Sequence, residues 1–138
     1  MAELKNRTIT KVRFSEVDSL GIVWHGHYIK YFEDGREAFG KEYGLGYMEV
    51  YANGFATVLV NINVDFKQIV SYEDNIIIET IYIPTKAAKI HFEFKIYKEK
   101  TNELVATGSS TQVFCTHDKK LHITNPPFYE KWKNENLK

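Results

Sequence analysis

The sequence is poor in cysteine: Cys115 is the single cysteine among 138 residues. An intramolecular disulfide is therefore excluded, and a reducing compartment such as the cytoplasm is favoured. No apolar run approaches the roughly 20 residues that cross a bilayer, so we expect no transmembrane segment. The first residues, Met1 to Asn6, lack the apolar core of a secretion signal. Together these absences predict a soluble, cytoplasmic protein.

Neither sign of charge is in excess, because Lys plus Arg and Asp plus Glu both number 18. This balance gives no reason to expect a nucleic acid or an anionic membrane as partner. The chain also lacks internal repeats, low-complexity segments and linker-like stretches. Its length suits one core of ordinary size. We therefore expect a single domain over residues 1–138.

Residue periodicity predicts one long helix among several strands. Residues 5–14 alternate as a strand, and residues 27–43 carry an apolar stripe at helical spacing that ends at Gly44. Gly35 lies on this stripe, which suggests close approach by a strand. Further strands are expected at residues 57–66, 74–83, 89–97 and 104–117, and short helices at 47–53 and 128–133. In the first of these strands, one buried face is predicted for Val58, Val60, Ile62, Val64 and Phe66.

This order of elements predicts an α+β fold. Strands that follow one another with short connections tend to be neighbours, and a helix with one apolar face needs a sheet to lie on. The economical arrangement is an antiparallel sheet of about five strands wrapped around one long central helix. Such a sheet leaves edges exposed, so pairing with a second copy of the chain is expected.

The stretch from Asp18 to Tyr28 places a carboxylate and a glycine turn directly before the long helix. A helix N-terminus has unpaired backbone N–H groups and partial positive charge, so it can stabilise an oxyanion that develops on a carbonyl. A carboxylate just upstream can act on the same carbonyl as general base or nucleophile. Taken alone, Asp18 is explained equally well as a residue that stabilises the turn before the helix.

The chain resembles the hot-dog-fold acyl-CoA thioesterases, in particular the group that contains the 4-hydroxybenzoyl-CoA thioesterases and the Tol–Pal-associated thioesterases. The strand pattern of residues 58–66 and the turn at residues 71–74 extend this resemblance over nearly the whole chain. The most specific segments are Val12-Arg13-Phe14, Asp18-x-x-Gly21-Ile22-Val23-Trp24-His25-x-x-Tyr28 and Tyr31-Phe32-Glu33.

The resemblance implies hydrolysis of an acyl-CoA to the free acid and CoA, at a site between subunits of a homodimer or homotetramer. Asp18 inherits the role of base or nucleophile, and the backbone N–H of His25 that of an oxyanion donor. The His25 imidazole is either catalytic, substrate-orienting or structural. Lys86 and Lys89 lie where the family places basic residues against the CoA phosphates. The substrate-binding residues implied are Gly21, Val23, Trp24, Tyr28, Thr57, Lys86 and Lys89.

Several questions stay open at this level. His25 resembles the aliphatic-acyl branch of the family, whereas Ile22-Val23-Trp24 resembles the aromatic-acyl branch. The acyl group is therefore undetermined. His25 and His27 alone are too few ligands for a metal, so we expect neither a metal site nor a cofactor beyond the CoA of the substrate. The alternatives are an acyl-carrier-protein thioesterase, a dehydratase of the same fold, and a non-catalytic acyl-CoA-binding module.

Overall fold

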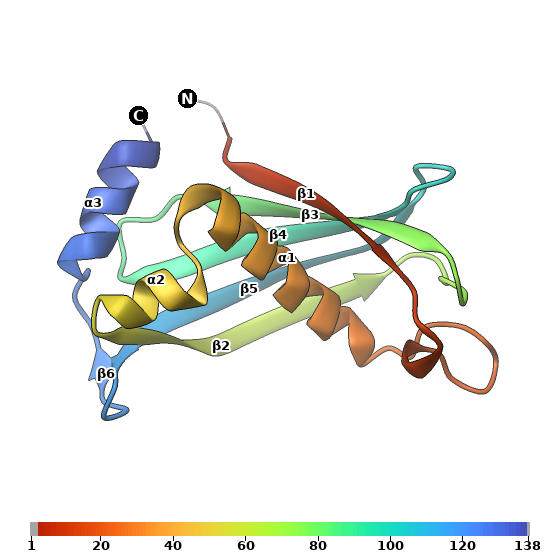
Figure 1. The fold of residues 1–138 in the computed structure, drawn as a ribbon, viewed down its shortest axis with the longest axis horizontal. Helices are drawn as coiled ribbons and strands as arrows, with labels where there is room; N and C mark the ends of the chain where they lie inside the picture. Colours follow the sequence, from red (N-terminus) through yellow and green to blue (C-terminus); the bar gives the residue numbers. More distant parts are fainter. Residues whose placement is uncertain (1–2, 138) are drawn as a thin grey trace.

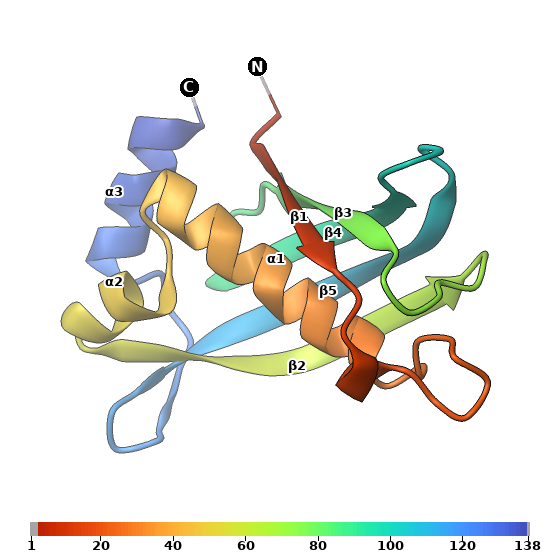
Figure 2. The same cartoon turned by 45° about the vertical axis from the view of Figure 1, so that its right-hand side comes forward.

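The structure is a computed structural model that describes residues 3–137. Five long strands and the two-residue β6 form one antiparallel sheet in the order β1-β3-β4-β5-β2, with β6 paired to β5. Helix α1 lies across one face of this sheet, and α3 packs near the C-terminal end of α1 (Figures 1 and 2). The elements are β1 (Lys5–Lys11), the 3-10 helix η1 (Phe14–Glu16), α1 (His27–Tyr43), α2 (Tyr47–Ala52), β2 (Phe55–Phe66), β3 (Asn75–Ile83), β4 (Lys89–Lys98), β5 (Leu104–Thr116), β6 (Leu121–His122) and α3 (Pro127–Asn136).

The core is the contact between the apolar stripe of α1 and the inner face of the sheet. Phe32 is fully buried and stacks on Phe94 of β4, with ring centroids 4.4 Å apart. Gly35 has the close strand contact that its position predicted, because a Cβ there would collide with Thr80 Oγ1 of β3. The helix ends as expected at Gly44, whose φ of +74° is left-handed. Local pattern and packing therefore agree along the whole of α1.

Strand β2 departs from the predicted alternation. Its register against β5 shifts between Leu59 and Asn61, which leaves Val60 as an extra residue in the strand. Because of this bulge, Leu59 lies on the side of α1, and Ile62 beyond the bulge packs against the core. The prediction of one buried face was wrong for Val58, Val60 and Phe66, which are 43%, 56% and 54% exposed. Strand β2 is also an edge of the sheet.

The end of the first strand also differs from expectation. The first strand ends at Lys11, and Phe14 belongs to η1 with 75% of its surface exposed. The chain turns there because the Arg13 N–H donates to the carboxylate of Glu16 instead of to a neighbouring strand. At the other end of the chain, Trp132 of α3 is 6% exposed and closes the core. No helix within residues 3–137 is long and apolar enough to cross a membrane.

Candidate active site

Asp18 lies in a tight hairpin that precedes α1. Val17 and Val23 pair as an antiparallel bridge, and the Gly21 N–H donates to the Asp18 carbonyl at 2.9 Å. Gly21 has a φ of +75°, a conformation that favours glycine. The Asp18 side chain is exposed, and its Oδ1 accepts a hydrogen bond from the Leu20 N–H at 2.8 Å. The hairpin thus holds the carboxylate while Oδ2 has no hydrogen-bond partner among residues 3–137.

Glu16 anchors this hairpin to α1. Its side chain is buried, and Oε1 accepts hydrogen bonds from the Tyr31 hydroxyl at 2.9 Å and from the Arg13 N–H at 2.8 Å. The Trp24 N–H donates to the Glu16 carbonyl at 3.0 Å, so the two ends of the hairpin are joined. Burial, together with the nearby Glu16 carboxylate, raises the pKa of Tyr31, so this hydroxyl stays protonated and donates.

The start of α1 presents unpaired backbone donors. The helix begins at His27, whose N–H donates to the Trp24 carbonyl at 2.9 Å. The N–H groups of His25 and Gly26 have no acceptor among residues 3–137, and the helix dipole adds partial positive charge at this end. Two adjacent free N–H groups at a helix start provide the donors that an oxyanion site requires.

The His25 ring lines a cavity of about 280 Å³ beside the helix start. Val23 and Tyr28 line the same cavity, and Tyr28 meets Phe66 of β2 edge-on with ring centroids 5.0 Å apart. Burial raises the pKa of Tyr28, so its hydroxyl is uncharged at neutral pH, and Lys67 lines the same cavity. Trp24 is half-exposed and lies against His25, with ring centroids 4.7 Å apart. The fold therefore gathers the predicted residues of the Asp18–Tyr28 stretch at one end of α1.

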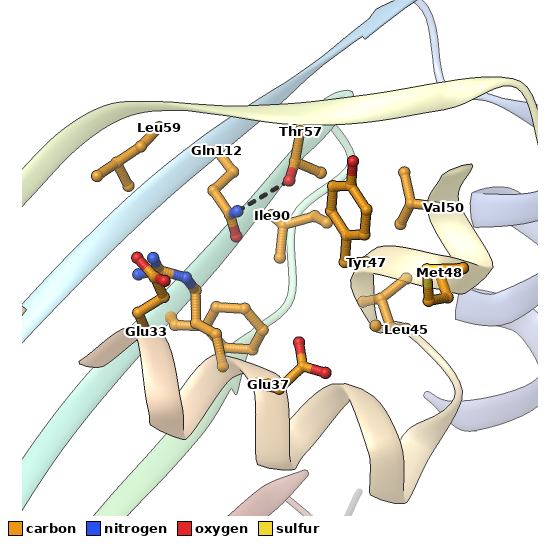
Figure 3. A pocket seen from close by; sticks show the side chains of 13 residues that line it. Glu33, Glu37, Leu45, Tyr47, Met48, Val50, Thr57, Leu59, Ile90 and Gln112 are labelled. Carbon is orange, nitrogen blue, oxygen red and sulfur yellow. Dashed lines mark hydrogen bonds between the residues drawn. The ribbon is translucent and has the colours of Figure 1, made fainter. Parts of the chain in front are cut away.

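A larger cavity of about 660 Å³ lies between α1, α2 and the inner face of the sheet (Figure 3). Thr57 is one of its lining residues, and its hydroxyl accepts a hydrogen bond from Gln112 Nε2 at 3.0 Å. His25 and Phe66 line the same small cavity, and Phe66 is at the opposite end of β2 from Thr57. Within one chain, Thr57 and His25 are therefore far apart. The apolar lining comes from Leu45, Met48, Val50, Leu59, Ile90 and Phe92.

Arg36 brings a positive charge into this larger cavity, and sequence reasoning missed it. No hydrogen bond or ion pair of its guanidinium occurs within residues 3–137, and Nη1 is buried. Its Cζ lies 6.0 Å from the centre of the Phe94 ring. Burial lowers the pKa of Arg36, against the opposing effect of Glu33. The sequence did contain a signal for Arg36, because this residue directly follows Gly35 of the apolar stripe and so lies beside the buried face of the helix.

Glu33 and Glu37, which lie outside the apolar stripe of α1, also line the larger cavity. Both residues are exposed, so each faces solvent and also borders the cavity. In Figure 3, Glu37 projects from α1 toward the space below Tyr47. The cavity thus has an apolar interior, one half-buried cation and two exposed carboxylates along its helical wall.

Lys86 and Lys89 line another cavity, of about 470 Å³, together with residues around β6. The Asn125 side chain holds this connection by donating to the Lys86 carbonyl at 2.9 Å. Lys89 pairs with Val113 of β5, which is near Thr57 and at the far end of the sheet from the Asp18 hairpin. One chain therefore does not bring the two lysines and Asp18 together. Within the described residues, no group of three His, Cys, Asp or Glu side chains is placed to hold a metal ion.

A long helix lying on an antiparallel sheet is the arrangement of the hot-dog fold. Residues 12–133 match the model of the thioesterase-like superfamily, and the chain belongs to this family. The Bacillus subtilis protein YneP, provisionally named an acyl-CoA thioesterase, is 28% identical over 75% of this chain and 74% of its own length.

Solved structures agree on the fold. The DHNA-CoA thioesterase from Staphylococcus aureus superposes with a TM-score of 0.86 at 22% identity, over 96% of this chain and 91% of that one. A mutant 4-hydroxybenzoyl-CoA thioesterase in complex with 4-hydroxybenzoyl-CoA gives 0.81 at 20% identity, over 94% and 98%. The predicted family, hot-dog fold and thioester-hydrolase activity are thereby confirmed. The roles of individual residues stay predictions.

Proposed function

We propose that the protein hydrolyses acyl-CoA thioesters, with Asp18 as general base or nucleophile. The observation that carries this proposal is the Asp18 carboxylate on a hairpin that closes directly against the free N–H groups at the start of α1. The names of the related proteins support CoA as the thiol. The related 4-hydroxybenzoyl-CoA thioesterase was studied with its thioester as an aspartate-to-asparagine mutant, the exchange that we propose for Asp18 below.

Two chemical routes use the same geometry. As a base, Asp18 takes a proton from water, whose oxygen attacks the thioester carbonyl carbon. As a nucleophile, a carboxylate oxygen attacks the same carbon, and water then hydrolyses the resulting anhydride. In both routes the carbonyl oxygen becomes anionic and accepts hydrogen bonds from the His25 and Gly26 N–H groups. The carbon–sulfur bond then breaks and CoA leaves as the thiolate, with no metal or redox cofactor required.

We infer that the complete site is shared by two copies of the chain. Edge strand β2 exposes Val58, Val60 and Phe66, and an exposed apolar edge is a template for strand pairing. Antiparallel pairing about a point near Val60 would place the Thr57 end of one copy beside the Phe66 end of the other, where His25 lies. The larger cavity of one subunit would then open beside the Asp18 hairpin of its partner. This supports a homodimer, alone or within a homotetramer.

The same pairing assigns a place to the CoA nucleotide. Lys86 and Lys89 belong to the Thr57 end of the sheet, so in the pair they lie on the side of the partner's Asp18 hairpin. Lysine binds phosphate as a point charge, without the bidentate geometry of arginine. We propose these lysines as the phosphate contacts. Gly21, Val23, Trp24 and Tyr28 are the proposed contacts to the acyl and pantetheine parts, in a cytoplasmic enzyme.

Replacing Asp18 tests the proposal. Free-thiol release is followed for wild type and Asp18→Asn with acyl-CoAs from acetyl to palmitoyl, and with benzoyl- and phenylacetyl-CoA. We expect kcat/KM for the best substrate to fall by about 10²- to 10⁴-fold, because the carboxylate is the reacting group. Asp118→Asn, in an exposed turn next to β6, is the matched control and should retain activity. Unchanged hydrolysis of every substrate by Asp18→Asn would overturn the proposal.

Other outcomes identify the rival functions. Faster turnover of matched acyl-carrier-protein thioesters than of acyl-CoAs would assign the chain to the carrier-protein thioesterases. Loss of water from 3-hydroxyacyl thioesters would indicate a dehydratase, which acts on the acyl Cα and Cβ instead of the carbonyl. Tight binding of acyl-CoA without hydrolysis by the wild type would indicate a non-catalytic module.

A further inference from the structure

The guanidinium of Arg36 lies on the wall of the larger cavity without a hydrogen bond or ion pair among the described residues. Its Nη1 is buried and has no acceptor within residues 3–137. The Arg36 side chain as a whole is half-buried, and taking part of a charge out of water without a hydrogen bond or ion pair costs free energy, so the fold gains no stability from it. The side chain of methionine would fill a similar apolar volume without that cost. Arg36 is therefore better explained by a bound group than by packing.

The position of Arg36 indicates which part of a ligand it meets. The guanidinium lies over Phe94, on the inner wall formed by α1 and β4, whereas Thr57 borders the cavity on edge strand β2. In the proposed pair, the partner's Asp18 hairpin lies at the β2 side. A thioester held there would direct its acyl group inward, across the apolar lining, toward Arg36.

The charges around the cavity narrow the chemistry of that group. Arg36 offers N–H donors, so its ligand atom is an acceptor, and an oxygen is the strongest candidate. Glu33 and Glu37 line the same cavity and would repel a carboxylate on the acyl group. A neutral hydroxyl or carbonyl oxygen satisfies Arg36 without this repulsion.

On the basis of the proposed thioesterase function, we propose that Arg36 is a specificity-determining residue. It selects acyl groups that have an apolar body and a neutral oxygen acceptor at the end remote from the thioester. An acyl group without that oxygen leaves the guanidinium unpaired when water is displaced from the cavity. Discrimination by a buried polar group of this kind exceeds what an apolar wall provides.

Matched pairs of CoA thioesters test this specificity. We compare benzoyl- with 4-hydroxybenzoyl-CoA and hexanoyl- with ω-hydroxyhexanoyl-CoA, and include 4-carboxybenzoyl-CoA as the charged case. In the wild type, the neutral oxygenated member of at least one pair should have the higher kcat/KM. Arg36→Met should lower the oxygenated-to-unsubstituted ratio by about 10- to 100-fold, the loss expected for a hydrogen bond to a charged group. Its kcat/KM for the unsubstituted member should change by less than about threefold.

Thermal stability separates selection from a structural role. Because Arg36→Met removes a half-buried cation that has no hydrogen bond or ion pair among the described residues, its Tm should equal or exceed that of the wild type. Lys41→Met is the matched control: it makes the same change on an exposed position of α1 outside the cavity, and should leave the ratio unchanged. Arg36→Lys keeps the charge, so it should retain part of the preference if Arg36→Met does not fold.

Three results would overturn the inference. One is a wild type that prefers the unsubstituted or the 4-carboxy member in every comparison. Another is an equal loss for both members of each pair in Arg36→Met, together with a lowered Tm. The third is an unchanged ratio in Arg36→Met. Binding of the same pairs to Asp18→Asn and to the Asp18→Asn/Arg36→Met double variant, measured by calorimetry, gives this ratio without turnover, so failure of the catalytic proposal remains distinguishable.

Discussion

The Tyr31 hydroxyl, on the buried face of α1, donates a hydrogen bond of 2.9 Å to Oε1 of Glu16, the residue that precedes the Asp18 hairpin in the chain. Both side chains are buried, and Glu16 also accepts the Arg13 N–H and, through its carbonyl, the Trp24 N–H. Glu16 therefore connects the segment after β1, the end of the hairpin and the helix. The position of Asp18 relative to the helix start depends on this connection.

Removal of that hydroxyl should loosen the hairpin. In Tyr31→Phe the buried Glu16 carboxylate loses one donor, so the free energy of unfolding should fall by about 1–3 kcal/mol in urea titrations. The kcat should fall more than the KM changes, because the carboxylate of Asp18 is less well positioned. Tyr72→Phe, at a half-exposed tyrosine without a hydrogen bond of its hydroxyl in the described chain, is the control. Wild-type kcat in a destabilised Tyr31→Phe would show that the connection serves stability alone.

His25 carries two separable predictions, one for its backbone and one for its ring. His25→Ala keeps the N–H at the helix start, so kcat should fall by less than about tenfold if the imidazole only orients the substrate. His25→Pro removes the N–H and should lower kcat by about 10²- to 10³-fold, the effect of losing one oxyanion donor. Circular dichroism and Tm verify that both variants are folded. Equal losses in the two variants would assign the effect to the imidazole.

A charge at the centre of the β2 edge should separate the subunits. In an antiparallel pair about Val60, a lysine at this position lies close to its own copy, and like charges across a strand pair are destabilising. Val60→Lys should therefore sediment as a monomer and lose hydrolysis, because Thr57 and Asp18 would no longer share one site. Ile9→Lys introduces the same charge at an exposed position of β1, the other edge of the sheet, and should remain oligomeric and active. A monomeric, fully active Val60→Lys would contradict the shared site.

Much of the fold is accessible from the sequence because it depends on local periodicity. The apolar stripe predicts α1 from residue 27 to residue 43, and Gly44 ends it in the left-handed conformation. The alternation of the strands likewise predicts β3, β4 and β5 to within a residue or two. The bulge at Val60 was not predictable, because it is a mismatch between β2 and its partner β5 and has no periodic signal of its own. That the chain forms one domain over residues 1–138 stays a prediction.

The candidate site divides in the same way. Sequence alone determined that a carboxylate, a glycine turn and a helix start are adjacent, because Asp18, Gly21 and His25 are neighbours in the chain. Tertiary structure decided which groups face a cavity: it set Thr57 and the lysines at the far end of the sheet and placed the unpaired Arg36 against Phe94. The physical reason is that sequence spacing reports on nearest neighbours, whereas the burial of a charge depends on strands that pair from distant parts of the chain.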